Sequence, residues 1–561
     1  MLGSEAVVHL LAGHGVTHIF GLCGDTSLEL YRALRDVKHG MRHILTRDER
    51  SASYMADAYA KVSGKVGVCE GPSGGGATYL LPGVAEANGG STALLALTTD
   101  ISVAGRGRFT LTDLDQEALF RPLTKWNRRI DLPGQIPPTL RDAFRYATSG
   151  NPGAVHVGLP MDVLSGEVAE SEVYAEPRFG SFPAVRQAPA EEEVEAAAGL
   201  LAESRHPVLV VGGGVHISGA HGELRRLAEL LGAPVATSIS GKHSLPDSHP
   251  LALGTVGSNG GSPFAAKVVS EADLVVFIGF RAGSVSTQKW QVPPRNRKTI
   301  IHIDADPEVV GVNYKTHAAV IGDARLALGR LNERLEEILP ANPKRRPRAE
   351  ELRRYKEAFL TELEPLFRSD ETPIRPERLV RELGALLPEG SVLLADPGTP
   401  CPYFAAYLTS ERAERSFLTP RTHGALGYAL PAVVGSYFAR PEVKHVAVMG
   451  DGSFAMAAGE LETIKRLGLP VTLVVVSNGS FGWIKAGQKF GFDAQYYSVD
   501  FSATDHARVA RAFGIKSYRV EAPGKLRPTL KKALAAGEPT LVDVICQPLE
   551  EARAPVAEWV A

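Results

Sequence analysis

The stretch VKHVAVMGDGS, residues 443–453, indicates the fold class, because an apolar strand runs directly into a glycine-rich turn. A second apolar run, LVVVS at 473–477, is followed by Asn478, so that the 25 residues 453–477 separate Gly452 from that asparagine. We expect a helix over 459–467 to connect the two strands. Parallel strands joined in this way end at the same edge of an open α/β sheet, where such sheets bind ligands. The pattern therefore predicts that Asp451 and Asn478 lie at one ligand-binding edge.

The residue types at this edge suit a cation and a phosphate group. Asp451 and Asn478 offer the oxygen ligands that Mg²⁺ prefers, with room left for phosphate oxygens and water. Gly450 and Gly452 let a phosphate approach the backbone and leave N–H groups free at a helix start. The GDG sequence alone also fits an ordinary tight turn after a strand. The asparagine after a second apolar strand favours the functional interpretation.

Outward from this stretch, the whole chain of 561 residues alternates helical and strand patterns. Such alternation is typical of βαβ units and parallel sheets. Loose segments divide the chain into three blocks, and we expect domains over 1–175, 190–340 and 372–561. The fold class is α/β, with three doubly wound parallel-sheet domains. No internal repeat is visible by eye.

The composition excludes several classes of protein. Lys and Arg number 61 against 63 Asp and Glu, a balance that argues against a dedicated nucleic-acid binder. The single basic run at 344–348 fits a solvated linker. The 4 cysteines form no CxxC pair, and no long apolar run or secretory leader is seen. We therefore expect a cytoplasmic enzyme or binding protein without membrane spans.

The GDGS turn and the distant asparagine together resemble the motif of thiamine diphosphate (ThDP) enzymes. The stretch RDERSASYMADAYA, 47–60, is similar to the pattern RHEQxAxxMAxGYAR of acetolactate synthase, and places Glu49 at the glutamate of that family. The resemblance covers nearly the whole chain. It points to the superfamily of acetolactate synthase, pyruvate oxidase and pyruvate decarboxylase, and most closely to the large, catalytic subunit of acetolactate synthase. It implies ThDP and Mg²⁺ as cofactors, with the metal held by Asp451, Asn478 and the backbone oxygen of Ser480.

The same resemblance names the domains pyrimidine-binding, central and diphosphate-binding, and assigns further roles. Glu49 would activate the cofactor through its aminopyrimidine ring. Leu426 would be the apolar wedge beneath the cofactor, and the carbonyl of Gly424 would accept from its 4′-amino group. Gly398 and Thr399 would contact the diphosphate. The other residues expected at the diphosphate are Gly450, Asp451, Gly452 and Ser453.

A second local match concerns the first block. The stretch FGLCGD, 20–25, is similar to the FGLPGD turn of pyruvate decarboxylases, so Asp25 is a candidate proton-transfer group. An ordinary turn aspartate fits equally well. The paired histidines of pyruvate decarboxylases are absent, with Phe109 and Thr110 in their place, and Ile484 stands for the active-site glutamate. These departures weaken an aldehyde-releasing decarboxylase.

Other departures concern acetolactate synthase itself. The tryptophan that selects the second 2-oxo acid corresponds to Gly487, and the phenylalanine before the Gln-Glu pair corresponds to Asp115. The flavin-associated stretch RFDDR reads RAGSV at 281–285, so FAD binding is doubtful. We expect a carboligase that decarboxylates a 2-oxo acid such as pyruvate to an enamine and adds it to a second carbonyl. The alternative is a non-oxidative decarboxylase.

The resemblance also implies a homo-oligomer, a dimer or a dimer of dimers, because in that family the glutamate of one subunit meets cofactor held by another. No nucleic acid or membrane partner is expected.

A rival interpretation is a serine hydrolase, since GPSGG at 71–75 fits the nucleophile elbow G-x-S-x-G around Ser73. A hydrolase gives Glu49, Asp451 and Asn478 no role. A binding protein of the same fold would not need Glu49.

Overall fold

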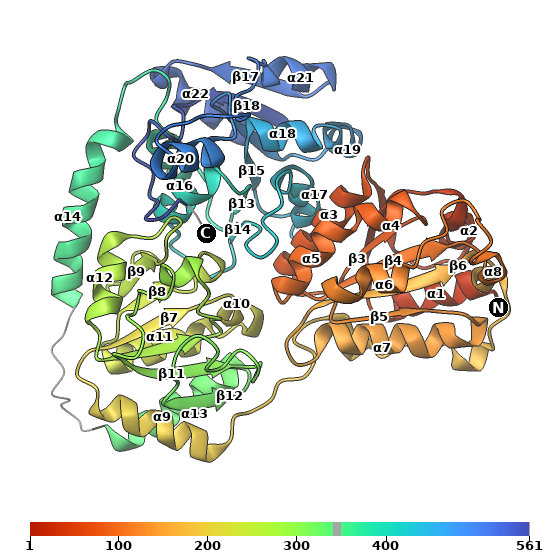
Figure 1. The fold of residues 1–561 in the computed structure, drawn as a ribbon, viewed down its shortest axis with the longest axis horizontal. Coiled ribbons are helices and arrows are strands. Elements are labelled where there is room, and N and C mark those ends of the chain that lie inside the picture. The colour runs from red at the N-terminus through yellow and green to blue at the C-terminus, as the bar shows by residue number, and fades with distance from the viewer. Residues whose placement is uncertain (340–348, 560–561) are drawn as a thin grey trace.

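The computed structural model describes residues 1–339 and 349–559, which form three lobes, each built around one parallel sheet (Figure 1). This confirms the predicted fold class. The basic run at 344–348 lies outside the described residues. Within the described ranges, no helix is long and apolar enough to cross a membrane.

The N-terminal lobe holds a 6-stranded sheet in the order β2-β1-β3-β4-β6-β5. Its strands are β1 (His18–Gly21), β2 (Arg42–Leu45), β3 (Gly67–Gly71), β4 (Leu94–Asp100), β5 (Trp126–Arg129) and β6 (Ala154–Pro160). Its α-helices are α1 (Gly3–Gly13), α2 (Leu28–Asp36), α3 (Glu49–Ser63), α4 (Gly75–Tyr79), α5 (Leu81–Gly89), α6 (Gln116–Phe120), α7 (Ile136–Thr148) and α8 (Met161–Ser165). Its central strands β3, β4 and β6 are buried along their whole length, as expected for a sheet covered on both faces.

The central lobe holds a 6-stranded sheet in the order β12-β11-β10-β7-β8-β9. Its strands are β7 (Pro207–Val211), β8 (Val235–Thr237), β9 (Ala252–Thr255), β10 (Leu274–Ile278), β11 (Thr299–Asp304) and β12 (Ala318–Ile321). Its α-helices are α9 (Glu191–Glu203), α10 (Gly214–Ser218), α11 (His221–Leu231), α12 (Pro263–Glu271) and α13 (Ala324–Ile338). Counted within the lobe, this is the doubly wound order 3-2-1-4-5-6 of dinucleotide-binding folds.

The C-terminal lobe follows the long helix α14 (Ala349–Phe367) and holds a sheet in the order β14-β13-β15-β16-β18-β17. Its strands are β13 (Val392–Ala395), β14 (Phe417–Leu418), β15 (His445–Gly450), β16 (Thr472–Ser477), β17 (Lys516–Val520) and β18 (Thr540–Ile545). Its helices are α15 (Pro376–Gly384), α16 (Pro400–Tyr407), α17 (Ala429–Ala439), α18 (Asp451–Ala457), α19 (Glu460–Leu467), α20 (Gly482–Gly491), α21 (His506–Ala512) and α22 (Pro523–Leu534). Two helices, α18 and α19, therefore connect β15 to β16, where the sequence predicted one.

The first and third sheets have the same strand order, 2-1-3-4-6-5 when each is counted within its own lobe. The helices that follow the second strand of each sheet, α3 and α17, pack against one another. A Cβ atom on Gly435 of α17 would lie 1.9 Å from the carbonyl oxygen of Met55, so only glycine permits this approach. One buried cluster, which includes Tyr54, Met55 and Val433, joins the two lobes into a single core.

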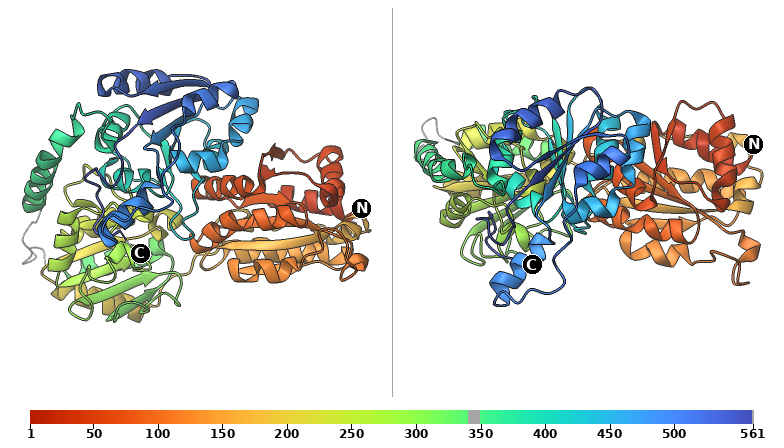
Figure 2. Two further views of the ribbon diagram at one scale, coloured as in Figure 1. Left: turned by 45° about the horizontal axis from the view of Figure 1, so that its top comes forward. Right: turned by 90° about the horizontal axis from the view of Figure 1, so that it is seen from above.

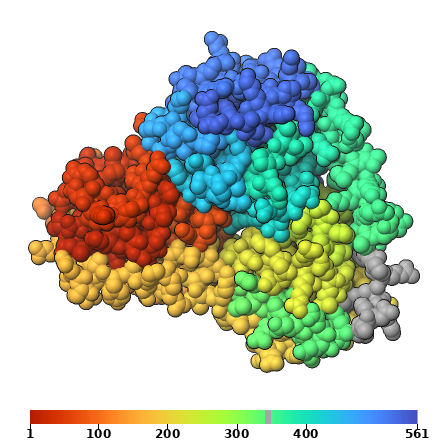
Figure 3. Space-filling view, turned by 180° about the vertical axis from the view of Figure 1, so that it is seen from behind, coloured from red at the N-terminus to blue at the C-terminus, as the bar shows by residue number. Residues whose placement is uncertain are grey.

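The lobes are in mutual contact in every view. Figure 2 shows them from two further directions, with the N-terminus at the outer end of the N-terminal lobe. Figure 3 shows the C-terminal lobe (cyan to blue) against both of the others. The carboxyl ends of β13, β15 and β16, three neighbours in one sheet, lie at a common edge.

Candidate functional site

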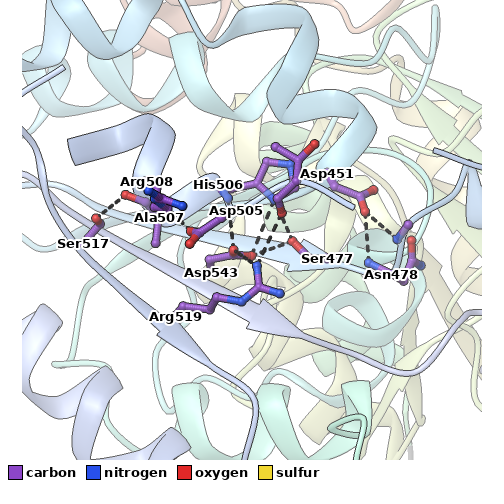
Figure 4. A network of polar contacts seen from close by, with 12 residues as sticks. Asp451, Ser477, Asn478, Asp505, His506, Ala507, Arg508, Ser517, Arg519 and Asp543 are labelled. Atoms are coloured by element: carbon purple, nitrogen blue, oxygen red, sulfur yellow. Dashed lines mark hydrogen bonds and ion pairs between the residues drawn. The ribbon is translucent and has the colours of Figure 1, made fainter. Parts of the chain in front are cut away.

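Asp451 joins the ends of the two strands that the sequence singled out. It is the first residue of α18, directly after β15. Its Oδ1 accepts from the N–H of Gly452 at 2.9 Å, and its Oδ2 accepts from the N–H groups of Asn478 at 3.0 Å and Gly479 at 2.7 Å (Figure 4). Burial raises the pKa of this carboxyl, and the three N–H donors oppose that shift. The carboxylate therefore fixes the turn after β16 against the turn after β15.

Thr399, in the loop after β13, lies beside Asn478 and so adds the end of a third strand to this edge of the sheet. The side-chain amide of Asn478 donates to the Thr399 hydroxyl at 3.2 Å. Thr399 precedes α16 in the loop after β13, next to Gly398, whose φ of 89° lies in the region that favours glycine. Thr399, Asp451 and Asn478 are thus close together, as the sequence predicted for the last two.

The donor set at this edge fits a hard cation. Asp451, the Asn478 amide and the main chain of Ser480 supply oxygen ligands of the type that Mg²⁺ takes. Ser480 is buried, and its hydroxyl oxygen has no hydrogen-bond partner among the residues the structure describes. No cluster of three or more His, Cys, Asp or Glu side chains that could hold a metal occurs in the described ranges. The chemistry of a mixed carboxylate, amide and carbonyl set at this edge is thus compatible with Mg²⁺.

A cavity of about 550 Å³ opens beside these residues. Its wall includes Asp451 and Asn478 together with the rings of Phe481 and Phe501, whose centroids lie 4.6 Å apart. A Cβ atom on Gly452 would come within 2.8 Å of the Phe481 ring, so the second glycine of the GDG turn makes room for this ring. The site thus combines a polar floor with an aromatic wall, as small-molecule sites do.

A buried polar network supports the turn from behind (Figure 4). The Ser477 hydroxyl donates to Asp543 at 2.5 Å and lies 3.0 Å from the His506 ring, and Arg519 pairs with Asp543 at 3.2 Å. Burial would raise the pKa of Asp543, but hydrogen bonds from His506 and Ser477 outweigh it, and the pKa is lowered. Sequence reasoning missed this network. Its one visible signal was a charged residue inside the apolar strand TLVDVI, 540–545.

The loop at 419–427, which carries Gly424 and Leu426, is held from the N-terminal lobe. Glu86 of α5 is buried, and its carboxylate accepts from the backbone N–H groups of three consecutive residues, 421–423, at 2.8, 3.1 and 2.8 Å. Gly424 follows with a φ of 68°, and Leu426 is half-buried. Sequence reasoning missed Glu86, because a contact across 335 residues leaves no local pattern.

Asp396 holds the far end of the same loop. Its Oδ1 accepts from the backbone N–H groups of Tyr428 at 2.8 Å and Ala429 at 3.1 Å, at the start of α17. Burial raises the pKa of this carboxyl to about 7, against the effect of these bonds. Glu86 and Asp396 together define the backbone path between them.

Glu49 lies on the N-terminal lobe, at the first position of α3. The side chain of Asp48 caps this helix by accepting from the Arg50 N–H at 2.7 Å. Glu49 is buried, and burial, followed by the nearby charges of Asp48 and Glu70, raises the pKa of its carboxyl. A Cβ atom on Gly76 would lie 3.0 Å from the Glu49 Oε1, so the glycine leaves space at that oxygen.

Asp25 and Ser73 lie near the same turn. Asp25 is exposed in a short 3₁₀ segment (Asp25–Ser27) after β1, and the neighbouring Thr26 hydroxyl accepts from the Ser73 N–H at 3.1 Å. The Ser73 hydroxyl is 2.6 Å from that of Thr112, and none of the described contacts joins it to a histidine. The structure therefore gives the hydrolase interpretation no activating base.

Two groups of predicted residues are thus assembled, and none of the described contacts joins Glu49 to Asp451 or Asn478, although Arg50 beside Glu49 donates to the Met456 carbonyl of α18. The cavity beside Asp451 and Asn478 is lined by residues from 373 onward, with none from the first sheet among the described residues. Glu49 and Asp25 flank the turn after β3 in the N-terminal lobe.

The central lobe has its own cleft, of about 280 Å³, at the carboxyl ends of β7 and β10. Arg281 begins the stretch at 281–285 that corresponds to the flavin-associated one. It donates to the Gly89 carbonyl and, at 2.6 Å, to the Ser91 hydroxyl. This side chain therefore connects the central lobe to the N-terminal lobe.

The fold and the first site define an α/β protein with a cavity at one sheet edge, whose polar groups suit a cation and a phosphate, and with a buried glutamate in a second lobe whose sheet has the same topology. Models of thiamine pyrophosphate enzymes match the chain in three parts: the N-terminal TPP binding domain over residues 1–119, the central domain over 194–331 and the C-terminal TPP binding domain over 396–544. The chain belongs to the thiamine pyrophosphate enzyme family.

Curated relatives extend over nearly the full chain. A probable acetolactate synthase large subunit of Methanococcus aeolicus is 34% identical over 560 residues, which is 98% of this chain and 92% of that protein. The corresponding protein of Methanocaldococcus jannaschii is 35% identical, over 98% and 93% of the two chains. An acetolactate synthase of Arthrospira platensis is 31% identical, over 97% and 93%.

Proposed function

We propose that this protein is a ThDP- and Mg²⁺-dependent carboligase of the acetolactate synthase type, which decarboxylates a 2-oxo acid such as pyruvate and joins the remaining fragment to a second carbonyl compound. The observation that carries the proposal is the pair of half-sites on two sheets of equal topology, one with a buried glutamate and one with a cation and phosphate edge. The names of the relatives, acetolactate synthases, favour carboligation over release of an aldehyde.

The proposed roles follow from the contacts. Glu49, with a pKa raised by burial, is suited to share a proton with a ring nitrogen of the cofactor. Asp451, Asn478 and the carbonyl of Ser480 would hold Mg²⁺, and bound ThDP would supply the electron sink that decarboxylation requires. The residues proposed for the diphosphate are Gly398, Thr399, Gly450, Gly452 and Ser453. Those proposed for the cofactor ring are Gly424 and Leu426. Asp25, exposed at the same turn as Glu49, would transfer protons.

We further propose that the active protein is a homodimer or a dimer of dimers in which Glu49 of one chain faces the Asp451 site of another. The absence of a described contact between Glu49 and the Asp451 cavity within one chain supports this. So do exposed apolar side chains, which a partner subunit would cover. They are Phe109 and Leu111 in the N-terminal lobe, and Ile484, Phe490, Phe492 and Tyr497 around α20. We place this assembly in the cytoplasm and assign it no flavin.

Product analysis tests the proposed reaction. We expect the purified protein, incubated with ThDP, Mg²⁺ and pyruvate, to form acetolactate, identified by NMR of the reaction mixture. Omission of either ThDP or Mg²⁺ should abolish product formation. Acetaldehyde as the sole product would instead support the alternative decarboxylase, and no consumption of any 2-oxo acid would contradict both.

A further inference from the structure

A small chamber lies where the three lobes meet, bordered by Glu86 and by the start of the loop at 419–427. Its volume is about 50 Å³, enough for several water molecules or one small oxyanion. Its wall includes Lys61 of α3, Glu86 of α5, Ser240 of the central lobe, and Arg415 and Arg421 on either side of β14. Three cationic side chains thus line one small space.

Arg415 is the unexplained group in this chamber. Among residues 1–339 and 349–559, no hydrogen bond or ion pair reaches its guanidinium group. An arginine side chain carries five N–H donors and stays protonated in proteins. Burial lowers the pKa of this guanidinium, which means that its charge is poorly solvated. The side chain is half-buried, so its donors are free for a ligand in the chamber.

Two carboxylates lie near the cationic groups of the chamber, and the charge of Asp57 partly compensates that of Arg415. Lys61 donates to Asp57 at 2.7 Å and lies 3.8 Å from Glu86. Asp57 also accepts from the Tyr428 hydroxyl at 2.7 Å, and Glu86 accepts from three backbone N–H groups. Glu86 is therefore fully engaged, whereas Asp57 keeps one buried carboxylate oxygen, Oδ1, without a partner.

Arg421 adds a third positive charge. The nearest polar atom recorded for its guanidinium group is the Cys401 Sγ, at 3.9 Å. The chamber therefore holds three cationic side chains beside two carboxylates that already have partners. This leaves a net positive charge and unused donors on both arginines.

We propose that this chamber binds a phosphoryl group, supplied either as inorganic phosphate or by a phosphorylated small molecule. Two guanidinium groups and an ammonium suit a tetrahedral dianion, because each arginine can donate two parallel bonds to phosphate oxygens. The chamber shares the wall residues Gly213, Ser240 and Thr422 with the cleft of about 280 Å³, which has room for the organic part of such a molecule. The bound group would connect all three lobes.

A thermal-melting titration tests this on the protein saturated with ThDP and Mg²⁺, so that the diphosphate site is filled. Sodium phosphate is titrated at constant ionic strength against sodium chloride. We expect a saturable rise in Tm for the natural protein. In Arg415→Gln and in Arg421→Gln the apparent phosphate affinity should fall by about 10- to 100-fold. Arg368→Gln, which changes an exposed arginine, should leave the titration unchanged.

The Tm without phosphate distinguishes a binding role of Arg415 from a structural one. Without phosphate, Arg415→Gln should melt at the same temperature as the natural protein or higher, because it removes a charge that has no partner. Ribose 5-phosphate, with ribose as control, distinguishes the two sources of the phosphoryl group. If ribose 5-phosphate binds more tightly than phosphate, the organic part of the ligand lies in the cleft. If the two bind equally, the ligand is inorganic phosphate. An absent Tm rise, or a rise that survives in both arginine variants, would overturn the proposal.

Discussion

Replacing Glu49 with glutamine should lower turnover by about 10²- to 10⁴-fold, the range of a lost general acid–base group. The amide keeps the size and the position at the start of α3, but it cannot exchange a proton with a ring nitrogen. Asp48 still caps the helix, so the fold should be retained. Steady-state kinetics with saturating ThDP and Mg²⁺ measure the effect.

The matched control is Glu29→Gln, which changes a carboxylate on α2 of the same lobe that pairs with Arg32 at its surface. Its turnover should equal that of the natural protein. ThDP affinity and Tm should also be nearly unchanged in Glu49→Gln, since the carboxyl contributes chemistry and little binding. Undiminished turnover in this variant would exclude Glu49 from the reaction.

Replacing Asp451 with asparagine should weaken Mg²⁺ binding by at least about 100-fold and ThDP binding with it, because an anionic metal ligand is lost. The same carboxylate accepts three backbone N–H groups. An amide oxygen cannot replace both carboxylate oxygens, so each lost charged hydrogen bond should also cost about 1.5–3 kcal/mol of unfolding free energy. Calorimetric titration and thermal melting measure the two effects.

Asp505→Asn serves as the control for this change. Asp505 caps α21 in the same lobe by accepting from the Arg508 N–H at 2.9 Å and makes no recorded contact with Asp451 or Asn478. Mg²⁺ affinity should stay at its natural value. If Asp451→Asn binds Mg²⁺ as tightly as the natural protein, the cation lies elsewhere.

The parts of the fold that could be predicted from sequence are those that depend on residues close together in the chain. Apolar runs that end in polar turn residues identified β15 and β16, and their shared edge placed Asp451 beside Asn478. The equal topology of the first and third sheets was not predicted. Their strands share only apolar character, and strand order depends on which strands pair, which no local pattern records.

The missed site residues have a common physical origin. Glu86 accepts hydrogen bonds from the backbone N–H groups of 421–423. Any side chains at these three positions would allow the same bonds, so the sequence there gives no sign of the contact. The packing of α3 on α17 likewise depends on one glycine, Gly435, whose meaning appears only when Met55 is beside it. Arg415 is ordinary in sequence and becomes notable only when Lys61 and Arg421 line the same small chamber. Such long-range relations require the folded structure.

Subunit mixing tests most directly whether the two half-sites form one reaction centre. The inactive variants Glu49→Gln and Asp451→Asn are coexpressed with different tags, and the hybrid dimer is purified through both. One of its two sites then combines an intact Glu49 from one chain with an intact Asp451 from the other, so we predict about half of the natural activity per dimer. A hybrid as inactive as its two parents would contradict a site shared between chains.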